Sequence, residues 1–157
     1  MSLELARMVG ADLLWSALAA LGFAVLFDVP RRLLPACLLL GALGHGSRTL
    51  LMKLGLGGVE AATLCAAVLV GFAAVGCARH ARVPAIVFAL PAAIPMVPGA
   101  FAFKTMLGVL RLVDAAAAPS PSLAVDTAVA AAKTALILAA LAVGVGSPGL
   151  VFRRSAS

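Results

Sequence analysis

Residues Ala89–Phe101 read ALPAAIPMVPGAF, an apolar run that contains three prolines and a glycine. Each proline removes a backbone N–H, and its ring clashes with the carbonyl oxygen four residues earlier, so a proline kinks or breaks an α-helix. Pro91, Pro95 and Pro98 lie close together, and Gly99 follows them directly. The stretch therefore predicts a break inside an otherwise continuous apolar helix.

The composition is that of a membrane protein. Of the 157 residues, 64% are hydrophobic and 11% are charged, and the mean hydropathy is +1.16. Soluble domains carry about 25% charged residues, so this chain has too little polar surface to cover itself in water. We expect a single all-α domain over residues 1–157, integral to the lipid bilayer.

Five apolar runs approach the length of about 20 residues that a helix needs to cross a bilayer. The links DVPRR, KLGLGG, RHAR and DAAAAPSPS separate them. We expect a polytopic all-α protein with transmembrane helices at residues 8–27, 33–52, 59–78, 84–112 and 123–145. The proline cluster would divide the fourth helix into two half-helices, Pro84–Ile94 and Gly99–Leu112, with the break over Ile94–Gly99.

A break at this depth has chemical consequences. Backbone groups without helical partners are tolerated in a membrane only within protein or beside a water-filled cavity. The half-helix that begins at Gly99 would direct its free N–H groups and the positive end of its dipole at the break, as discontinuous transporter helices do. We predict a binding site for an anion at Pro95, Pro98 and Gly99. The alternative is a kinked helix with a structural role only.

Charged residues inside the apolar runs are further candidates, because such residues are costly in a membrane and mark functional sites. Arg48, Lys104 and Lys133 are predicted to bind an anionic substrate. For the first two, the alternative is a side chain that extends to the membrane surface. Asp126 lies seven residues before Lys133 on the same helix face, about 10 Å away. Because this distance is too long for a close ion pair, Lys133 needs a partner on another helix, on another subunit or in the substrate.

The second span contains the stretch LLLGALGHGSR. His45 could exchange protons near neutral pH and is the candidate proton-coupling residue. Its alternative is a hydrogen-bonded packing residue. Gly41, Gly44 and Gly46 would allow a neighbouring helix to approach closely.

Several other classes of protein are disfavoured. The basic residues occur in scattered pairs without interleaved aromatic residues, unlike a nucleic-acid-binding surface. His45 and Ser47 are about 200° apart around a helix and cannot act together as base and nucleophile. The sequence contains no paired carboxylates, metal-ligand spacing or phosphate-binding loop. We therefore expect no enzymatic activity, no cofactor and no metal.

Basic residues in the links predict the orientation of the chain. Loops rich in arginine and lysine remain in the cytoplasm. Three basic residues fall on one side of a five-span arrangement: Arg7, Lys53 and Arg111. Six fall on the other side: Arg31, Arg32, Arg79, Arg82, Arg153 and Arg154. The N-terminus is therefore predicted outside and the C-terminus in the cytoplasm.

Four segments carry a resemblance to a known family: LGFAVLFDVPRRLL, LLLGALGHGSRTLLM, VPAIVFALPAAIPMVPGAFAF and SPGLVFRR. They resemble the bacterial threonine/serine exporter family, in the form of its small YjjB-like subunit of a split exporter. His45, Gly46 and Arg48 match the family's glycine–histidine–glycine motif. Asp28 and Phe103 depart from the pattern, in which asparagine and tyrosine are common, and the second departure leaves substrate preference open.

The same resemblance extends to the proline cluster, where Pro95, Pro98 and Gly99 match the family's broken-helix motif. It implies a multi-pass protein of the bacterial inner membrane that exports small carboxylates, such as succinate, or the amino acids threonine and serine. It also implies a larger partner subunit with its own membrane spans and a cytoplasmic domain. The alternative is an assembly subunit that does not transport, with the whole pathway in the partner.

Overall fold

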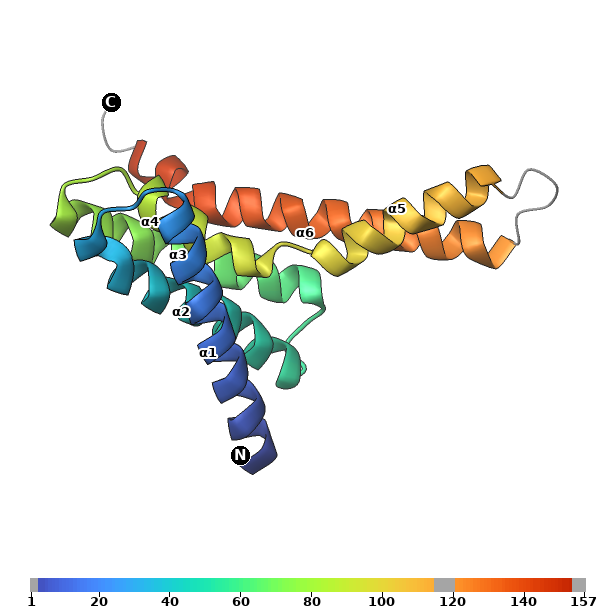
Figure 1. Ribbon diagram of the computed structural model, residues 1–157, viewed down its shortest axis with the longest axis horizontal. Coiled ribbons are helices and arrows are strands. Elements are labelled where there is room, and N and C mark those ends of the chain that lie inside the picture. Colours follow the sequence, from blue (N-terminus) through green and yellow to red (C-terminus); the bar gives the residue numbers. More distant parts are fainter. Residues whose placement is uncertain (1–2, 115–120, 154–157) are drawn as a thin grey trace.

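The structure, a computed structural model, describes residues 3–114 and 121–153. This part of the chain is helical and contains no strand (Figure 1), which confirms the all-α fold. The elements are α1 (Leu3–Leu26), η1 (Arg31–Leu33), α2 (Leu34–Lys53), α3 (Val59–Ala81), α4 (Ile86–Ala93), η2 (Ile94–Met96), α5 (Gly99–Asp114) and α6 (Pro121–Arg153), where η denotes a 3₁₀-helix.

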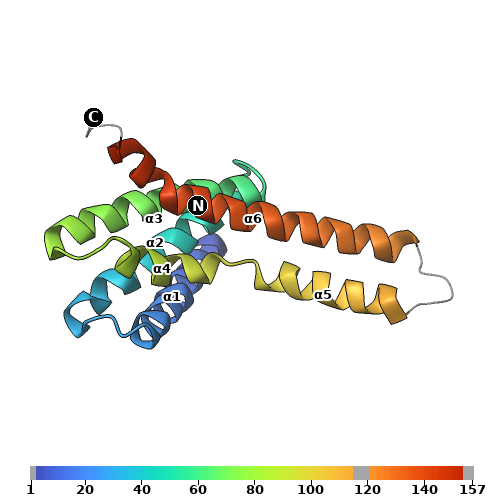
Figure 2. The same cartoon turned by 90° about the horizontal axis from the view of Figure 1, so that it is seen from above.

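The helices form a bundle from which an arm projects (Figures 1 and 2). In the bundle, α1 packs against α2, α2 against α3, and α3 against α6, while α4 contacts both α2 and α3. α5 runs beside the N-terminal part of α6, and these two segments extend away from α1 and α2. We use the term arm for α5 together with residues 121–133 of α6.

Small residues set the close spacing of the bundle helices. Ala20, Ala24, Ala66, Ala74 and Ala92 are fully buried. A methyl group added at Gly71 of α3 would lie 3.0 Å from the carbonyl oxygens of Gly144 and Val145 in α6. Such small side chains let helix backbones approach each other, which is how membrane helices associate.

Prolines inside the helices are accommodated by side-chain donors. Pro91 lies within α4 and leaves the carbonyl of Val87 without its usual N–H. The Cys37 thiol of α2 lies 3.7 Å from this carbonyl oxygen and donates to it. Pro91 therefore does not end α4, and the break comes later in the chain.

The predicted break of the fourth span is confirmed, and it is narrow. α4 continues into η2, so the residues up to Met96 remain helical. Val97 is extended, with ψ of 134°, Pro98 follows it, and α5 begins at Gly99 as predicted. The two half-helices, Ile86–Met96 and Gly99–Asp114, are bent by 57° relative to each other.

The last helix is longer than predicted. It runs to Arg153 and passes through Pro148, although the sequence pattern placed its end at residue 145. Pro148 removes the donor to the carbonyl of Gly144, and the Ser147 hydroxyl replaces it at 2.7 Å. The helix can therefore continue beyond the proline.

The expected number of five spans is not reproduced. Within the described residues, three helices are long and apolar enough to cross a membrane, over Arg7–Leu26, Val59–Ala81 and Pro121–Val151, and the broken pair would make a fourth. The predicted second span corresponds to α2, which has 20 residues but is not among them. His45, Ser47 and Arg48 lower the apolar character of α2.

Candidate functional site

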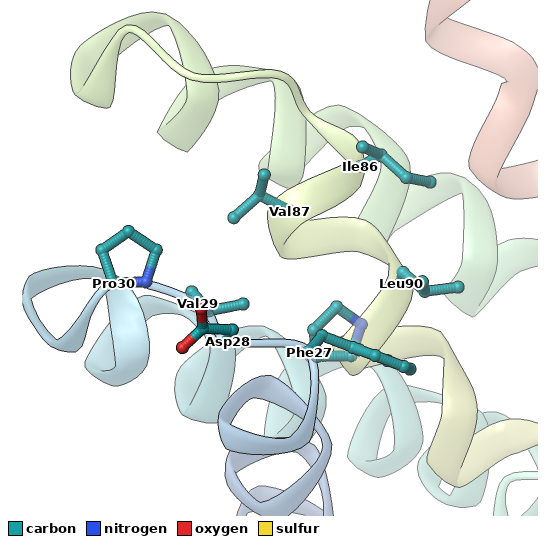
Figure 3. Close-up of a pocket in the computed structure, with 8 residues that line it drawn as sticks. Phe27, Asp28, Val29, Pro30, Ile86, Val87 and Leu90 are labelled. Atoms are coloured by element: carbon teal, nitrogen blue, oxygen red, sulfur yellow. The ribbon is translucent and has the colours of Figure 1, made fainter.

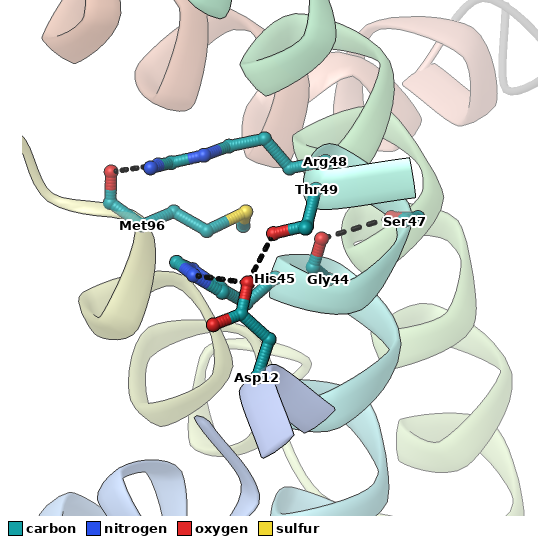
Figure 4. Close-up of polar contacts among 7 residues, drawn as sticks. All are labelled: Asp12, Gly44, His45, Ser47, Arg48, Thr49 and Met96. Atoms are coloured by element: carbon teal, nitrogen blue, oxygen red, sulfur yellow. Dashed lines mark hydrogen bonds and ion pairs between the residues drawn. The ribbon is translucent and has the colours of Figure 1, made fainter. Parts of the chain in front are cut away.

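The break in the fourth span lies beside Arg48 of α2. Nη1 of Arg48 donates a hydrogen bond of 2.8 Å to the carbonyl oxygen of Met96, the last residue of η2 (Figure 4). This carbonyl belongs to the C-terminal end of the first half-helix, where unpaired carbonyl groups carry partial negative charge. The Arg48 guanidinium therefore stabilises the present geometry of the break.

An acidic residue of α1 completes this group. The Thr49 hydroxyl donates to Oδ2 of Asp12 at 2.6 Å, and Nε2 of His45 lies 3.8 Å from the same oxygen (Figure 4). The second distance exceeds that of a hydrogen bond. Asp12 was not among the residues selected from the sequence, although an acidic residue inside an apolar run was the signal that could have identified it. We call Asp12, His45, Arg48, Thr49 and the Met96 carbonyl the break site.

The break site contains two unsatisfied polar atoms. Nδ1 of His45 and Nε of Arg48 are buried and have no hydrogen-bond partner among the described residues. A buried polar group without a partner is destabilising. A substrate with hydrogen-bonding groups could supply the missing partners.

The three glycines of α2 lie at helix contacts. A methyl group at Gly41 would overlap Ala20 of α1, and one at Gly46 would overlap Leu13 of α1. At Gly44, a methyl group would lie 2.6 Å from Cγ2 of Val70 in α3 and 3.2 Å from Cε of Met96. These contacts place α2 between α1, α3 and the break, and they keep Arg48 within reach of Met96.

The start of α5 differs from the expected cluster of free N–H groups. The amide of Gly99 donates to the Val97 carbonyl at 2.9 Å, and Pro98 has no N–H. The donors of the first turn are therefore the amides of Ala100 and Phe101. Pro95 lies in η2 beside the break site, within the half-helix that Arg48 caps.

The two lysines predicted to bind substrate lie in the arm. Lys104 of α5 and Lys133 of α6 line one shallow pocket of about 310 Å³, together with Phe101 and Asp126. The Lys133 ammonium lies over the ring of Phe101, 5.4 Å from its centroid, within the range of a cation–π interaction. We call this the arm pocket. It brings together two cationic groups that are 29 positions apart in the sequence.

The predicted site residues thus separate into two groups. Arg48 and His45 belong to the break site, and Pro95, Pro98 and Gly99 lie beside it. Lys104 and Lys133 lie at the arm pocket. α5 joins the two groups, because it begins at the break and its Phe101 lines the arm pocket.

Another pocket, of about 280 Å³, lies between the α1–α2 connection and α4 (Figure 3). Asp28 is the only charged residue in its lining, which otherwise consists of Phe27, Val29, Pro30, Ile86, Val87, Leu90 and Pro91. Because this lining contains no cationic residue, the pocket does not have the groups that an anionic ligand needs.

Comparison with known proteins agrees with the architecture. A family model described as Threonine/Serine exporter, ThrE, matches residues 12–151, which include α2, the break and almost all of α6. No solved structure matches the chain. Its helices, its broken span and this match agree: the chain is a membrane protein that belongs to the threonine/serine exporter family.

Proposed function

We propose that the chain is the membrane subunit of a secondary transporter that exports small carboxylates or amino acids together with a larger partner subunit. The observation that carries this proposal is the break at Val97–Pro98 with the Arg48 guanidinium bound beside it. Discontinuous helices of this kind hold the substrate sites of many secondary transporters. The cationic groups are suited to a carboxylate.

Arg48 links substrate binding to the shape of the break. In the structure the guanidinium holds a neutral carbonyl, that of Met96. A substrate carboxylate forms a stronger, charge-assisted and often bidentate bond with arginine. Binding would therefore separate Arg48 from the Met96 carbonyl and allow the angle between the two half-helices to change. A substrate that binds more tightly to the conformation with the changed angle shifts the population toward it.

The arm pocket supplies a second cationic position along the same route. Lys104 and Lys133 could receive the carboxylate after Arg48 releases it, because α5 connects the two places directly. We further propose that the protein lies in the bacterial inner membrane, with its N-terminus outside and its C-terminus in the cytoplasm. The larger subunit, with its own membrane spans and a cytoplasmic domain, would complete the pathway.

Proteoliposomes test the proposal. The chain is purified with the larger subunit that accompanies it, reconstituted, and loaded with radiolabelled L-threonine, L-serine or succinate. We expect at least one compound to leave several times faster than from protein-free vesicles. Release at the protein-free rate for all three would contradict the proposal. Full export by the partner alone would show instead that this chain is an assembly subunit.

A further inference from the structure

A pocket of about 350 Å³ opens between the first turns of α1 and the last turn of α2. It is lined by Met8, Ala11, Asp12, Thr49 and Lys53. We call it the α1–α2 pocket. Its volume lies at the lower end of the range for small-molecule sites, which suits a ligand of a few heavy atoms.

The pocket contains one charge of each sign. The Asp12 side chain is 42% exposed, and Lys53 is also exposed. Within the described residues, Asp12 and Lys53 form no ion pair with each other, and Nε2 of His45, 3.8 Å from Asp12, is charged only when it is protonated. A carboxylate and an ammonium that line one pocket without pairing are the complement of a ligand that carries both charges.

The contacts of Asp12 favour a cationic partner. Thr49 donates its hydroxyl hydrogen to Oδ2 of Asp12, so the lone pairs of the Thr49 oxygen remain free to accept. Both side chains therefore present acceptors to the pocket. An ammonium group donates up to three hydrogen bonds and accepts none, whereas a second carboxylate at this position would face the negative charge of Asp12.

We propose that the α1–α2 pocket binds the zwitterion of an α-amino acid, with the ammonium group on Asp12 and Thr49 and the carboxylate toward Lys53. This inference rests on the proposed export function and deepens it, because it assigns the residue that distinguishes amino acids from dicarboxylates. The cationic residues of the break site and arm pocket account for a carboxylate. For the ammonium group, Asp12 lies in a pocket with a single basic residue, whereas Asp126 shares the arm pocket with two lysines.

Ligand binding to the full chain in lipid nanodiscs tests the assignment. The probes are L-threonine and 3-hydroxybutyrate, which has a hydrogen atom in place of the ammonium group. We expect the unaltered chain to bind threonine at least about tenfold more tightly. Asp12→Asn removes the charge but keeps an acceptor for Thr49, and it should weaken threonine binding about 10- to 100-fold while leaving 3-hydroxybutyrate binding undiminished.

Three further variants distinguish the role of Asp12 from that of Lys53. Lys53→Gln, at the exposed end of α2, should weaken both probes, because both carry a carboxylate. Asp28→Asn is the matched control: it removes an acidic charge beyond the other end of α1, where φ is 56°, a conformation that asparagine tolerates. It should bind threonine like the unaltered chain, and Asp12→Glu should recover part of the lost affinity.

The inference is overturned if the unaltered chain binds no threonine at millimolar concentration, if it binds the two probes equally, or if Asp12→Asn leaves threonine binding unchanged. Its failure is distinct from failure of the export function. Vesicles that release succinate but not threonine would support export and exclude this site. Threonine binding that depends on Asp12, without release of any compound, would support the site and exclude export.

Discussion

Replacement of Arg48 by methionine is expected to lower the initial rate of export about 10- to 100-fold. Methionine keeps much of the apolar bulk but removes the guanidinium that donates to the Met96 carbonyl and that we propose binds the substrate carboxylate. A hydrogen bond that involves a charged group contributes about 1.5–3 kcal/mol, which corresponds to this range. The measurement is the efflux of labelled substrate from the proteoliposomes described above.

Two variants make the Arg48 result interpretable. Arg48→Lys keeps the charge but lacks the planar fork of donors, so we expect an intermediate rate. Arg31→Met removes an exposed arginine of η1 and should export normally. If the Arg48→Met protein assembles with its partner and exports at the unaltered rate, Arg48 has no part in the pathway.

Replacement of Lys133 by methionine is expected to raise the KM for export about tenfold or more. Lys133 lies at the inner end of the arm pocket, over Phe101, and is less exposed than Lys104. Lys104→Met should therefore have the smaller effect. If one carboxylate contacts both lysines, the double variant should lose less than the sum of the two single losses, because residues that share a ligand are not additive.

Further lysine variants distinguish substrate binding from interaction with the membrane surface. Lys133→Arg retains a charge that can reach the same carboxylate, and it should restore most of the affinity. If Lys133→Met, Lys104→Met and the double variant all keep the unaltered KM and maximal rate, the arm pocket has no role in transport. Both ammonium groups then only extend to the membrane surface.

Local chemistry explains which parts of the fold were predictable. The break and the start of α5 at Gly99 follow from proline and glycine alone, whatever surrounds them. The extent of the break does not, because Pro91 is accommodated by Cys37, which is 54 positions away. The predicted end of α6 was wrong for a related reason, since the Ser147 hydroxyl supplies the donor that Pro148 removes.

Most residues of the candidate site could be identified from the sequence, but their arrangement into a break site and an arm pocket could not. His45 and Arg48 stood out as charges within an apolar run, yet their contacts depend on helix packing. Asp12 was missed because its contact with Thr49 spans 37 positions and joins two helices. Without it, the charges within the predicted spans are Arg48, Lys104 and Lys133 against Asp126, a balance that favours an anionic ligand. The structure adds an acidic group to this cluster, and the proposal of an ammonium-binding position rests on it.

For transport through this chain, the break at Val97–Pro98 must face an aqueous path and not lipid. Labelling with a membrane-impermeant thiol reagent in proteoliposomes measures this accessibility. The background replaces Cys65 and Cys77 by alanine and Cys37 by serine, which keeps a donor for Val87. Val97→Cys is compared with Val109→Cys on the outer face of α5, since both valines are 47% exposed.

We expect rapid labelling of the Val97→Cys protein, slowed by a transported substrate, and little labelling of the Val109→Cys protein. Equally slow labelling at both positions, unaffected by substrate, would place the break against lipid and exclude a transport path at this position.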